Sequence, residues 1–185
     1  MSDFVILDRD GVINVDLMTY VTRPEDFEPI QGSLDAISLL NKNGFKVAIA
    51  TNQACIEKNI ITDEELSEVH NYMLKLLKEV GGNIEYIAYC PHAPESQCKC
   101  RKPQTGLLEE IETHLKIDLK GSYFIGDKES DILAGRSHGC IPLLIKTGGY
   151  GEKVFGSLNS PPKEHCFDNL MGAVEFILKT NDENS

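Results

Sequence analysis

Two aspartates separated by one residue are the first side chains in the sequence that could do chemistry together. Asp8 and Asp10 belong to the motif DRDG at 8–11, which directly follows a short apolar run. Two carboxylates this close repel each other unless a cation lies between them. Asp127 would add a third oxygen donor, and Asp131 would add a fourth acidic group. Such donors suit Mg²⁺, which keeps waters and binds substrate phosphate, whereas DRDG alone is equally typical of a capped turn.

A second cluster combines three cysteines and a histidine within 11 residues. The sequence has Cys90 and His92, then Cys98 and Cys100 after a five-residue gap, and an Arg-Lys pair at 101–102 follows directly. Three thiolates and an imidazole match a closed tetrahedral zinc site, which is structural because no position is left for water. The alternative is a group of buried cysteines beside a surface histidine. Cys55 is expected to be a small packing residue, and Cys140 and Cys166 are expected to be buried thiols. Four histidines are expected to be surface or hydrogen-bonded groups without a ligand role: His70, His114, His138 and His165.

Length and composition limit the classes of protein that are possible. The 185 residues are 41% hydrophobic and 25% charged, which predicts one soluble globular domain over 1–185 with a frayed tail at 180–185. The net charge of −11 disfavours a nucleic-acid partner. The sequence has no apolar run near the ~20 residues of a membrane span, and its start resembles no signal peptide. We therefore expect a cytoplasmic monomer that binds neither membranes nor nucleic acid.

Short apolar segments alternate with amphipathic ones along the chain, and this pattern predicts a parallel sheet with helices on both faces. Buried strands are expected at 4–8, 45–51, 83–90, 123–127 and 140–146. Helices are expected at 33–43, from 62 to the glycines at 81–82, and at 105–115, 130–138 and 167–179. The predicted fold class is α/β, in three layers and Rossmann-like.

Polar and charged side chains follow several of the expected strands. Asp8 and Asp10 follow the first, Thr51 ends the second, the cysteine cluster with Lys102 follows the third, and Asp127 follows the fourth. Because the carboxyl ends of parallel strands meet at one rim of the sheet, these groups should lie together, where such sheets bind ligands. Carboxylates, a hydroxyl and a cation in one place predict an active site.

Four motifs in this order resemble those of the haloacid dehalogenase superfamily of phosphohydrolases: DRDGV at 8–12, TNQ at 51–53, RKP at 101–103 and GDKESD at 126–131. The resemblance implies that Asp8 attacks phosphorus and forms an aspartyl-phosphate. Asp10 would protonate the leaving oxygen and then activate water, so we expect Asp10 to be protonated while Asp8 is ionised. Thr51 and Lys102 would hold the phosphoryl oxygens. Mg²⁺ would be bound by Asp8, the Asp10 carbonyl and Asp127.

The zinc loop at 90–102 narrows the resemblance to the D-glycero-D-manno-heptose 1,7-bisphosphate phosphatases and their relatives, the histidinol-phosphatases. The segments NVD at 14–16 and IKTGGYG at 145–151 favour the heptose enzymes. The resemblance places these residues at the substrate: Asp16, Tyr20, Thr51, Asn52, Gln53, Arg101, Lys102 and Lys128. This chain departs from the family at 54–59, which has no glycine and carries Lys58 near the usual arginine, and 14–20 is one residue longer.

The resemblance implies a Mg²⁺-dependent phosphatase without a large cap domain, which removes the C7 phosphate of heptose 1,7-bisphosphate. Its product would serve nucleotide-activated heptose synthesis for lipopolysaccharide core or surface glycans. Histidinol phosphate is the alternative substrate. A nucleic-acid 3′-phosphatase shares DxDG and TNQ but conflicts with the acidic charge, and a catalytically silent binding module conflicts with the intact motifs.

Overall fold

The computed structural model describes residues 3–183 and contains one parallel β-sheet. Its six strands lie in the order β3-β2-β1-β4-β5-β6, and every neighbouring pair is parallel. The strands are β1 (Phe4–Leu7), β2 (Lys46–Asn52), β3 (Tyr86–Cys90), β4 (Tyr123–Gly126), β5 (Ile141–Ile145) and β6 (Cys166–Phe167). The predicted parallel α/β fold is therefore confirmed.

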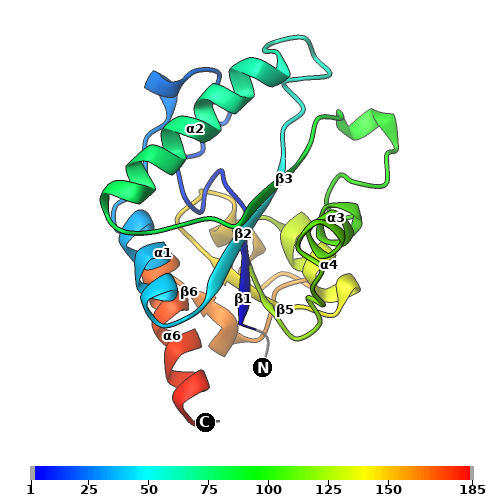
Figure 1. Ribbon diagram of the computed structural model, residues 1–185. Coiled ribbons are helices and arrows are strands. Elements are labelled where there is room, and N and C mark those ends of the chain that lie inside the picture. Colours follow the sequence, from blue (N-terminus) through cyan, green and yellow to red (C-terminus); the bar gives the residue numbers. More distant parts are fainter. Residues whose placement is uncertain (1–2, 184–185) are drawn as a thin grey trace.

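Helices cover both faces of the sheet and give three layers (Figure 1). The helices are α1 (Ser33–Lys42), α2 (Asp63–Glu79), α3 (Gly106–Leu115), α4 (Glu129–His138), α5 (Gly151–Val154) and α6 (Leu170–Glu183). Val5 and Leu7 of β1 pack toward α1, α2 and α6, whereas Phe4 and Ile6 pack toward α3 and α4. This alternation follows from the two-residue period of a strand. The central strand is thus buried on both faces, as its uninterrupted apolar sequence predicted.

Capping groups set where individual helices begin. Thr62 and Glu65 form a capping box at the start of α2, each side chain bonding the other residue's backbone N–H. At α6, the Asn169 side chain accepts a hydrogen bond of 3.0 Å from the Gly172 N–H. The helix therefore starts at Leu170, and the prediction of a helix from residue 167 was wrong because Phe167 extends the sheet beside β5.

Other boundaries differ from expectation by a few residues. The third strand is five residues long and begins at Tyr86, not at residue 83. At the C-terminus α6 continues through Glu183, so 180–183 are helical where a frayed tail was expected, and 184–185 lie outside the described residues. The Cys166 side chain, expected to be buried, is half-buried because β6 is the edge strand.

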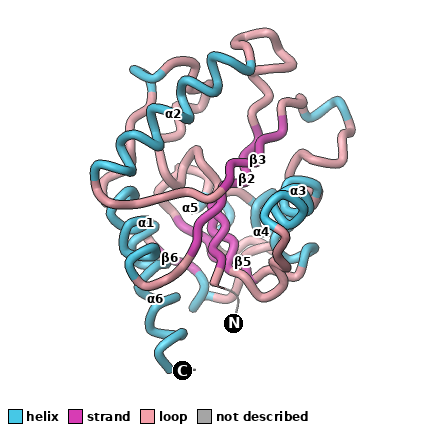
Figure 2. The backbone as a smooth tube through the Cα atoms, in the orientation of Figure 1, coloured by secondary structure: helices cyan, strands magenta, loops and turns pink. Residues whose placement is uncertain are grey.

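The topology leaves a crevice beside β1. The chain passes from β1 to β2 on one side and reaches β4 on the other, so the direction of the strand order changes at β1. Within the described residues, the connections at 8–32 and 53–62 hold loops and one short 3-10 turn, with no separate cap domain (Figure 2). No helix in residues 3–183 is long and apolar enough to cross a membrane.

Candidate active site

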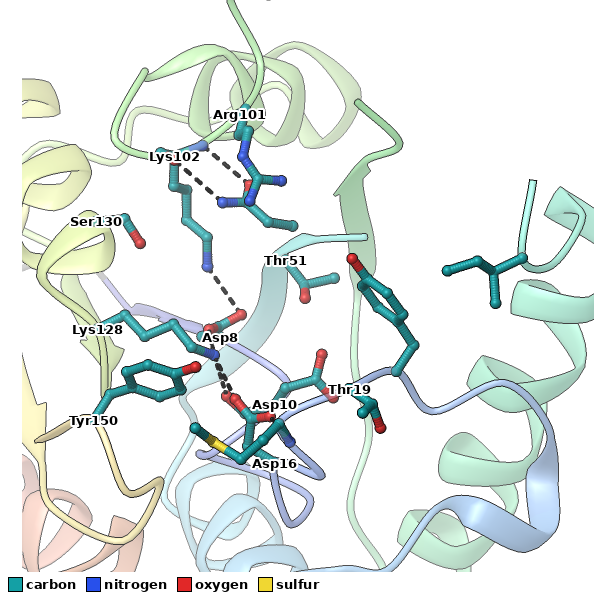
Figure 3. Close-up of a pocket in the computed structure, with 14 residues that line it drawn as sticks. Asp8, Asp10, Asp16, Thr19, Thr51, Arg101, Lys102, Lys128, Ser130 and Tyr150 are labelled. Carbon is teal, nitrogen blue, oxygen red and sulfur yellow. Dashed lines mark hydrogen bonds and ion pairs between the residues drawn. The ribbon is translucent and has the colours of Figure 1, made fainter. Parts of the chain in front are cut away.

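The four residues predicted to carry the chemistry line one cleft of about 710 Å³ at the carboxyl ends of the strands (Figure 3). They are Asp8, Asp10, Thr51 and Lys102. Most of the predicted substrate residues line the same cleft: Asp16, Tyr20, Asn52, Arg101 and Lys128. The motifs, far apart in the sequence, therefore meet at one rim of the sheet.

Asp8 is held by a buried ammonium group. Lys102 Nζ lies 2.9 Å from Asp8 Oδ1 and 2.6 Å from Asp131 Oδ1, and it donates a 2.7 Å hydrogen bond to the Ala50 carbonyl. Although burial opposes the charged form, the two carboxylates raise the pKa of Lys102 above its ordinary value. The three N–H groups of the ammonium therefore have three acceptors, and its position is fixed.

Asp10 is held by a different cation, its neighbour Arg9. The Arg9 guanidinium donates to both Asp10 oxygens at 2.9–3.2 Å, and Asn14 and Gln53 each add a hydrogen bond of 2.9 Å. Burial raises the pKa of Asp10, but Arg9 and these hydrogen bonds outweigh it and lower the pKa to about 2. The expectation of a protonated Asp10 was therefore wrong for the free protein, because the bonded guanidinium favours the carboxylate.

Thr51 has an orientation suited to donating a hydrogen bond into the cleft. Its Oγ1 accepts a hydrogen bond of 2.9 Å from Gln53 Nε2, which leaves the hydroxyl hydrogen free to bond another acceptor. Gln53 is 1% exposed and does not line the cleft, so its predicted contact with substrate is not met. The Asn52 amide forms two hydrogen bonds with the Lys102 backbone, at 3.0 and 3.2 Å. Asn52 thereby joins the end of β2 to the segment that carries Lys102.

Asp127 is the carboxylate best suited to a metal ion. Its side chain is fully buried, and no group among residues 3–183 donates a hydrogen bond to either oxygen. Burial first, and then neighbouring carboxylates, raise its pKa to about 8 despite the nearby Lys128 ammonium. A Cβ at Gly11 or Gly148 would overlap the Asp127 carboxylate, so these glycines allow the chain to enclose it.

The three predicted magnesium ligands surround one cation position. Lys128 Nζ lies 3.3 Å from the Asp10 carbonyl, 3.6 Å from Asp127 Oδ1 and 3.9 Å from Asp8 Oδ2. Oxygen ligands of Asp8, Asp127 and Asp131 also lie within 4.8 Å of one another. These facing carboxylates raise the pKa of Lys128 although burial opposes the charge. A site that collects oxygen atoms around a positive charge fits Mg²⁺.

The cysteine cluster has the dimensions of a tetrahedral zinc site. The Sγ atoms of Cys90, Cys98 and Cys100 lie 3.1–3.6 Å apart, and His92 Nδ1 lies 3.6 Å from Cys90 Sγ and 3.2 Å from Cys100 Sγ. Zinc–sulfur bonds of about 2.3 Å imply sulfur–sulfur edges of about 3.8 Å, so small shifts would complete the site. Cys98 Sγ accepts from the Arg101 N–H at 3.3 Å, which links the cluster to the cleft.

The loop at 14–20 contributes to the cleft wall, and the loop at 54–59 contacts it through Lys58. Asp16 Oδ2 lies 3.0 Å from Lys128 Nζ, and Tyr20 OH lies 3.0 Å from Lys58 Nζ. Glu57 accepts hydrogen bonds from the Ala93 N–H and the Ser96 hydroxyl, so the 54–59 loop is tied to the zinc loop. The sequence assigned no role to other residues of the cleft wall: Met18, Thr19, Ile60, Ser130 and Tyr150. Ser130 and Tyr150 had a signal, because they lie in the quoted segments 126–131 and 145–151, and Met18 and Thr19 lie in the segment 14–20.

The fold and these grouped motifs define a hydrolase of the haloacid dehalogenase type, and the HAD-hydrolase-like family model matches residues 99–173. The D-glycero-beta-D-manno-heptose-1,7-bisphosphate 7-phosphatase of Pseudomonas putida is 44% identical over 94% of this chain and 98% of its own length. The protein of that name in Pseudomonas aeruginosa is 39% identical over 95% and 97% of the two chains. The chain therefore belongs to this family of phosphoric monoester hydrolases, which confirms the resemblance drawn from the motifs.

A solved structure shows the same similarity. The D,D-heptose 1,7-bisphosphate phosphatase of Bordetella bronchiseptica, crystallised with magnesium and phosphate, superposes with a TM-score of 0.90 at 33% identity. The match covers 96% of this chain and 98% of that one. The fold class predicted from the sequence is thus supported over nearly the whole chain.

Proposed function

We propose that this chain hydrolyses the C7 phosphate of D-glycero-β-D-manno-heptose 1,7-bisphosphate and releases heptose 1-phosphate. The observation that carries the proposal is the cleft in which Asp8, Asp10, Thr51 and Lys102 meet, in a member of a family whose relatives bear this activity in their names. The β anomer is chosen because those names specify it. The product would serve nucleotide-activated heptose synthesis for lipopolysaccharide core or surface glycans.

Asp8 acts as the nucleophile in the proposed mechanism. One of its carboxylate oxygens attacks phosphorus, the bond from phosphorus to the sugar oxygen breaks, and the phosphoryl group remains on Asp8 as an aspartyl-phosphate. Lys102 offsets the negative charge that builds up beside Asp8, and the Thr51 hydroxyl donates to a phosphoryl oxygen. Water then attacks phosphorus, and phosphate leaves with Asp8 regenerated.

Asp10 handles the protons of both steps. It gives a proton to the departing sugar oxygen and then takes one from the attacking water. In the free protein the bonds to Arg9 keep Asp10 in its carboxylate form. Asp10 must therefore take up a proton from solvent or from a monoanionic phosphate ester when the substrate binds, because the negative charge of the bound phosphate raises the pKa of a nearby carboxyl.

Two metal ions belong to the proposal. Asp8, the Asp10 carbonyl and Asp127 would hold Mg²⁺, which supplies positive charge to the transferring phosphoryl group. The thiolates and the imidazole would hold a structural zinc ion: Cys90, His92, Cys98 and Cys100. The zinc loop would then position Arg101 and the adjoining Lys102. The Arg101 guanidinium donates a hydrogen bond of 3.0 Å to the His92 carbonyl.

The rest of the cleft selects the sugar. Arg101 and Lys128 provide the cations for a substrate that carries a second phosphate, and Asp16 can accept hydrogen bonds from sugar hydroxyls. Tyr20 and Asn52 complete the wall beside them. We further propose that the whole chain forms one catalytic domain that acts as a cytoplasmic monomer on this small substrate, without a nucleic-acid or membrane partner.

Phosphate release in the presence of Mg²⁺ tests the proposal directly. Both anomers of heptose 1,7-bisphosphate are compared with histidinol phosphate at equal concentrations, with Asp8→Asn as the control for contaminating phosphatase. We expect kcat/KM for the β-bisphosphate to exceed that for histidinol phosphate at least about 100-fold, a difference of about 2.7 kcal/mol in transition-state binding. A preference for histidinol phosphate would refute the substrate assignment, and a preference for the α anomer would correct the anomer.

A further inference from the structure

Arg9 is a charged residue buried completely at the bottom of the site. Its side chain is 0% exposed, and it lies under the cleft without lining it. Isolated buried charges are strongly unfavourable, so each N–H of such a guanidinium needs an acceptor. Nε and Nη2 donate to the Asp10 carboxylate, and Nη2 also lies 3.3 Å from Gln53 Oε1. The Nε and Nη2 edge of the Arg9 guanidinium therefore faces Asp10, and Nη1 on the opposite side still needs a hydrogen-bond acceptor.

His70 of α2 lies beside Nη1 of Arg9. Its Nε2 is 3.1 Å from Arg9 Nη1, and the residue is 7% exposed. An arginine is always charged and can only donate, so His70 Nε2 must be the acceptor and the imidazole must be neutral. Burial first, and the Arg9 charge second, lower the pKa of His70 to about 3, which agrees with the neutral form. The Tyr89 ring packs edge-on against the imidazole, with centroids 6.1 Å apart.

The result is a continuous set of contacts from α2 to Asp10. His70 fixes one end of the guanidinium, Arg9 binds both Asp10 oxygens, and Gln53 bonds Arg9, Asp10 and Thr51. A carboxylate bound through both oxygens cannot rotate about its last torsion without breaking these bonds. A lysine at position 9 would offer one ammonium in place of the planar fork and could not hold both oxygens in the same way.

We propose that Arg9 and His70 are positioning residues, which lock the Asp10 carboxylate in the orientation from which it transfers a proton to the sugar oxygen. This role rests on the phosphatase mechanism proposed above. Neither residue touches the substrate: Arg9 acts through Asp10, and His70 acts through Arg9. The helix α2, although it contributes no group to the cleft wall, thereby controls the proton-transfer step.

Two substrates separate this role from general damage to the site. A sugar phosphate has a poor leaving group that must be protonated, whereas the nitrophenolate of p-nitrophenyl phosphate departs without a proton. Single-turnover phosphoryl transfer is measured for the sugar phosphate, and the pre-steady-state burst of nitrophenolate is measured for the aryl phosphate. The Asp10→Asn variant sets the loss expected when proton transfer fails entirely. Any alkyl phosphate that the wild type hydrolyses can replace the heptose, so failure of the substrate assignment leaves this experiment intact.

The variants differ in whether an acceptor faces Arg9. His70→Leu removes it, His70→Gln retains a carbonyl oxygen near the same place, and Arg9→Met removes the guanidinium. We expect His70→Leu and Arg9→Met to slow transfer from the alkyl phosphate about tenfold or more while the aryl burst rate changes less than about threefold, with KM unaltered. His70→Gln should restore most of the rate. Equal losses on both substrates, or no loss on the alkyl phosphate, would overturn the proposal; His70→Leu decides it if Arg9→Met does not fold.

Discussion

Asp127 should make the magnesium-free protein less stable as the pH rises from 6 to 8. Its pKa is about 8 in the folded protein against 3.8 for the ordinary carboxyl, so between these values the folded state holds a proton that the unfolded chain has released. The stability that this proton contributes is complete below pH 3.8 and is lost as the pH rises through 8. Asp10 has the opposite shift, to about 2, so its contribution is already complete and constant in this window.

The size of the effect follows from the number of protons involved. One proton difference changes the free energy of unfolding by about 1.4 kcal/mol per pH unit, and Asp127 is half deprotonated near pH 8. Between pH 6.5 and 8 the loss is therefore about 1.6 kcal/mol, or several degrees in Tm for a chain of this size. His70, whose pKa is about 3, acts in the other direction, but its contribution is nearly complete above pH 6.5, the pKa of an ordinary imidazole.

Urea unfolding of zinc-loaded, magnesium-free protein measures this loss, with Asp127→Asn as the matched control. The variant cannot titrate at this position. Between pH 6.5 and 8 its free energy of unfolding should therefore fall by about 1.6 kcal/mol less than that of the wild type. Added Mg²⁺ requires the ionised carboxylate, so it should stabilise the wild type more at pH 8 than at pH 6.5. Identical pH profiles of wild type and variant would refute the assignment of a raised pKa to Asp127.

Three substitutions test other parts of the site. Asp8→Asn should reduce turnover about a thousandfold or more while circular dichroism and zinc content stay unchanged; activity within tenfold of wild type would exclude Asp8 as nucleophile. Cys98→Ser should release zinc and lower Tm, and a variant that melts like wild type but is inactive would contradict a structural role. Lys102→Met leaves Asp8 and Asp131 without their buried cation, so unfolding in urea should show a loss of about 3–5 kcal/mol, and a loss below about 1 kcal/mol would count against the ion pair.

The sequence predicted the position of the site because parallel sheets bring strand ends together. Asp8, Thr51 and Asp127 each stand at the end of an apolar run, and one rim is the place where such ends meet. The grouping of Cys90, His92, Cys98 and Cys100 could also be predicted, because these residues are close in the sequence and their types alone suggest a metal site. Both inferences used only local patterns and one rule of topology.

The environment of Asp10 could not be predicted in this way. Arg9 lies between two acidic residues near the chain start, a position that gives no sign of burial. It is buried because His70, 61 residues later, and Gln53 supply acceptors from two other elements. No periodic pattern connects these residues. The pKa of Asp10 depends on them, and the sequence expectation of a protonated carboxyl was wrong for that reason.

The two aspartates that we propose as catalytic are thus each bound by a different cation. Lys102 bonds Asp8, Asp131 and the Ala50 carbonyl, so it has no N–H left for a substrate while Asp8 is free. When Asp8 becomes an acyl phosphate in the proposed reaction, its carboxyl group loses its charge and releases one of these N–H groups, which can then bond the phosphoryl oxygens without movement of the lysine. Arg9 bonds Asp10 and does not line the cleft, so in the proposed reaction it acts only through Asp10. Because Lys102 can change partners in place, the site needs no conformational change in the lysine to stabilise the phosphorylated aspartate.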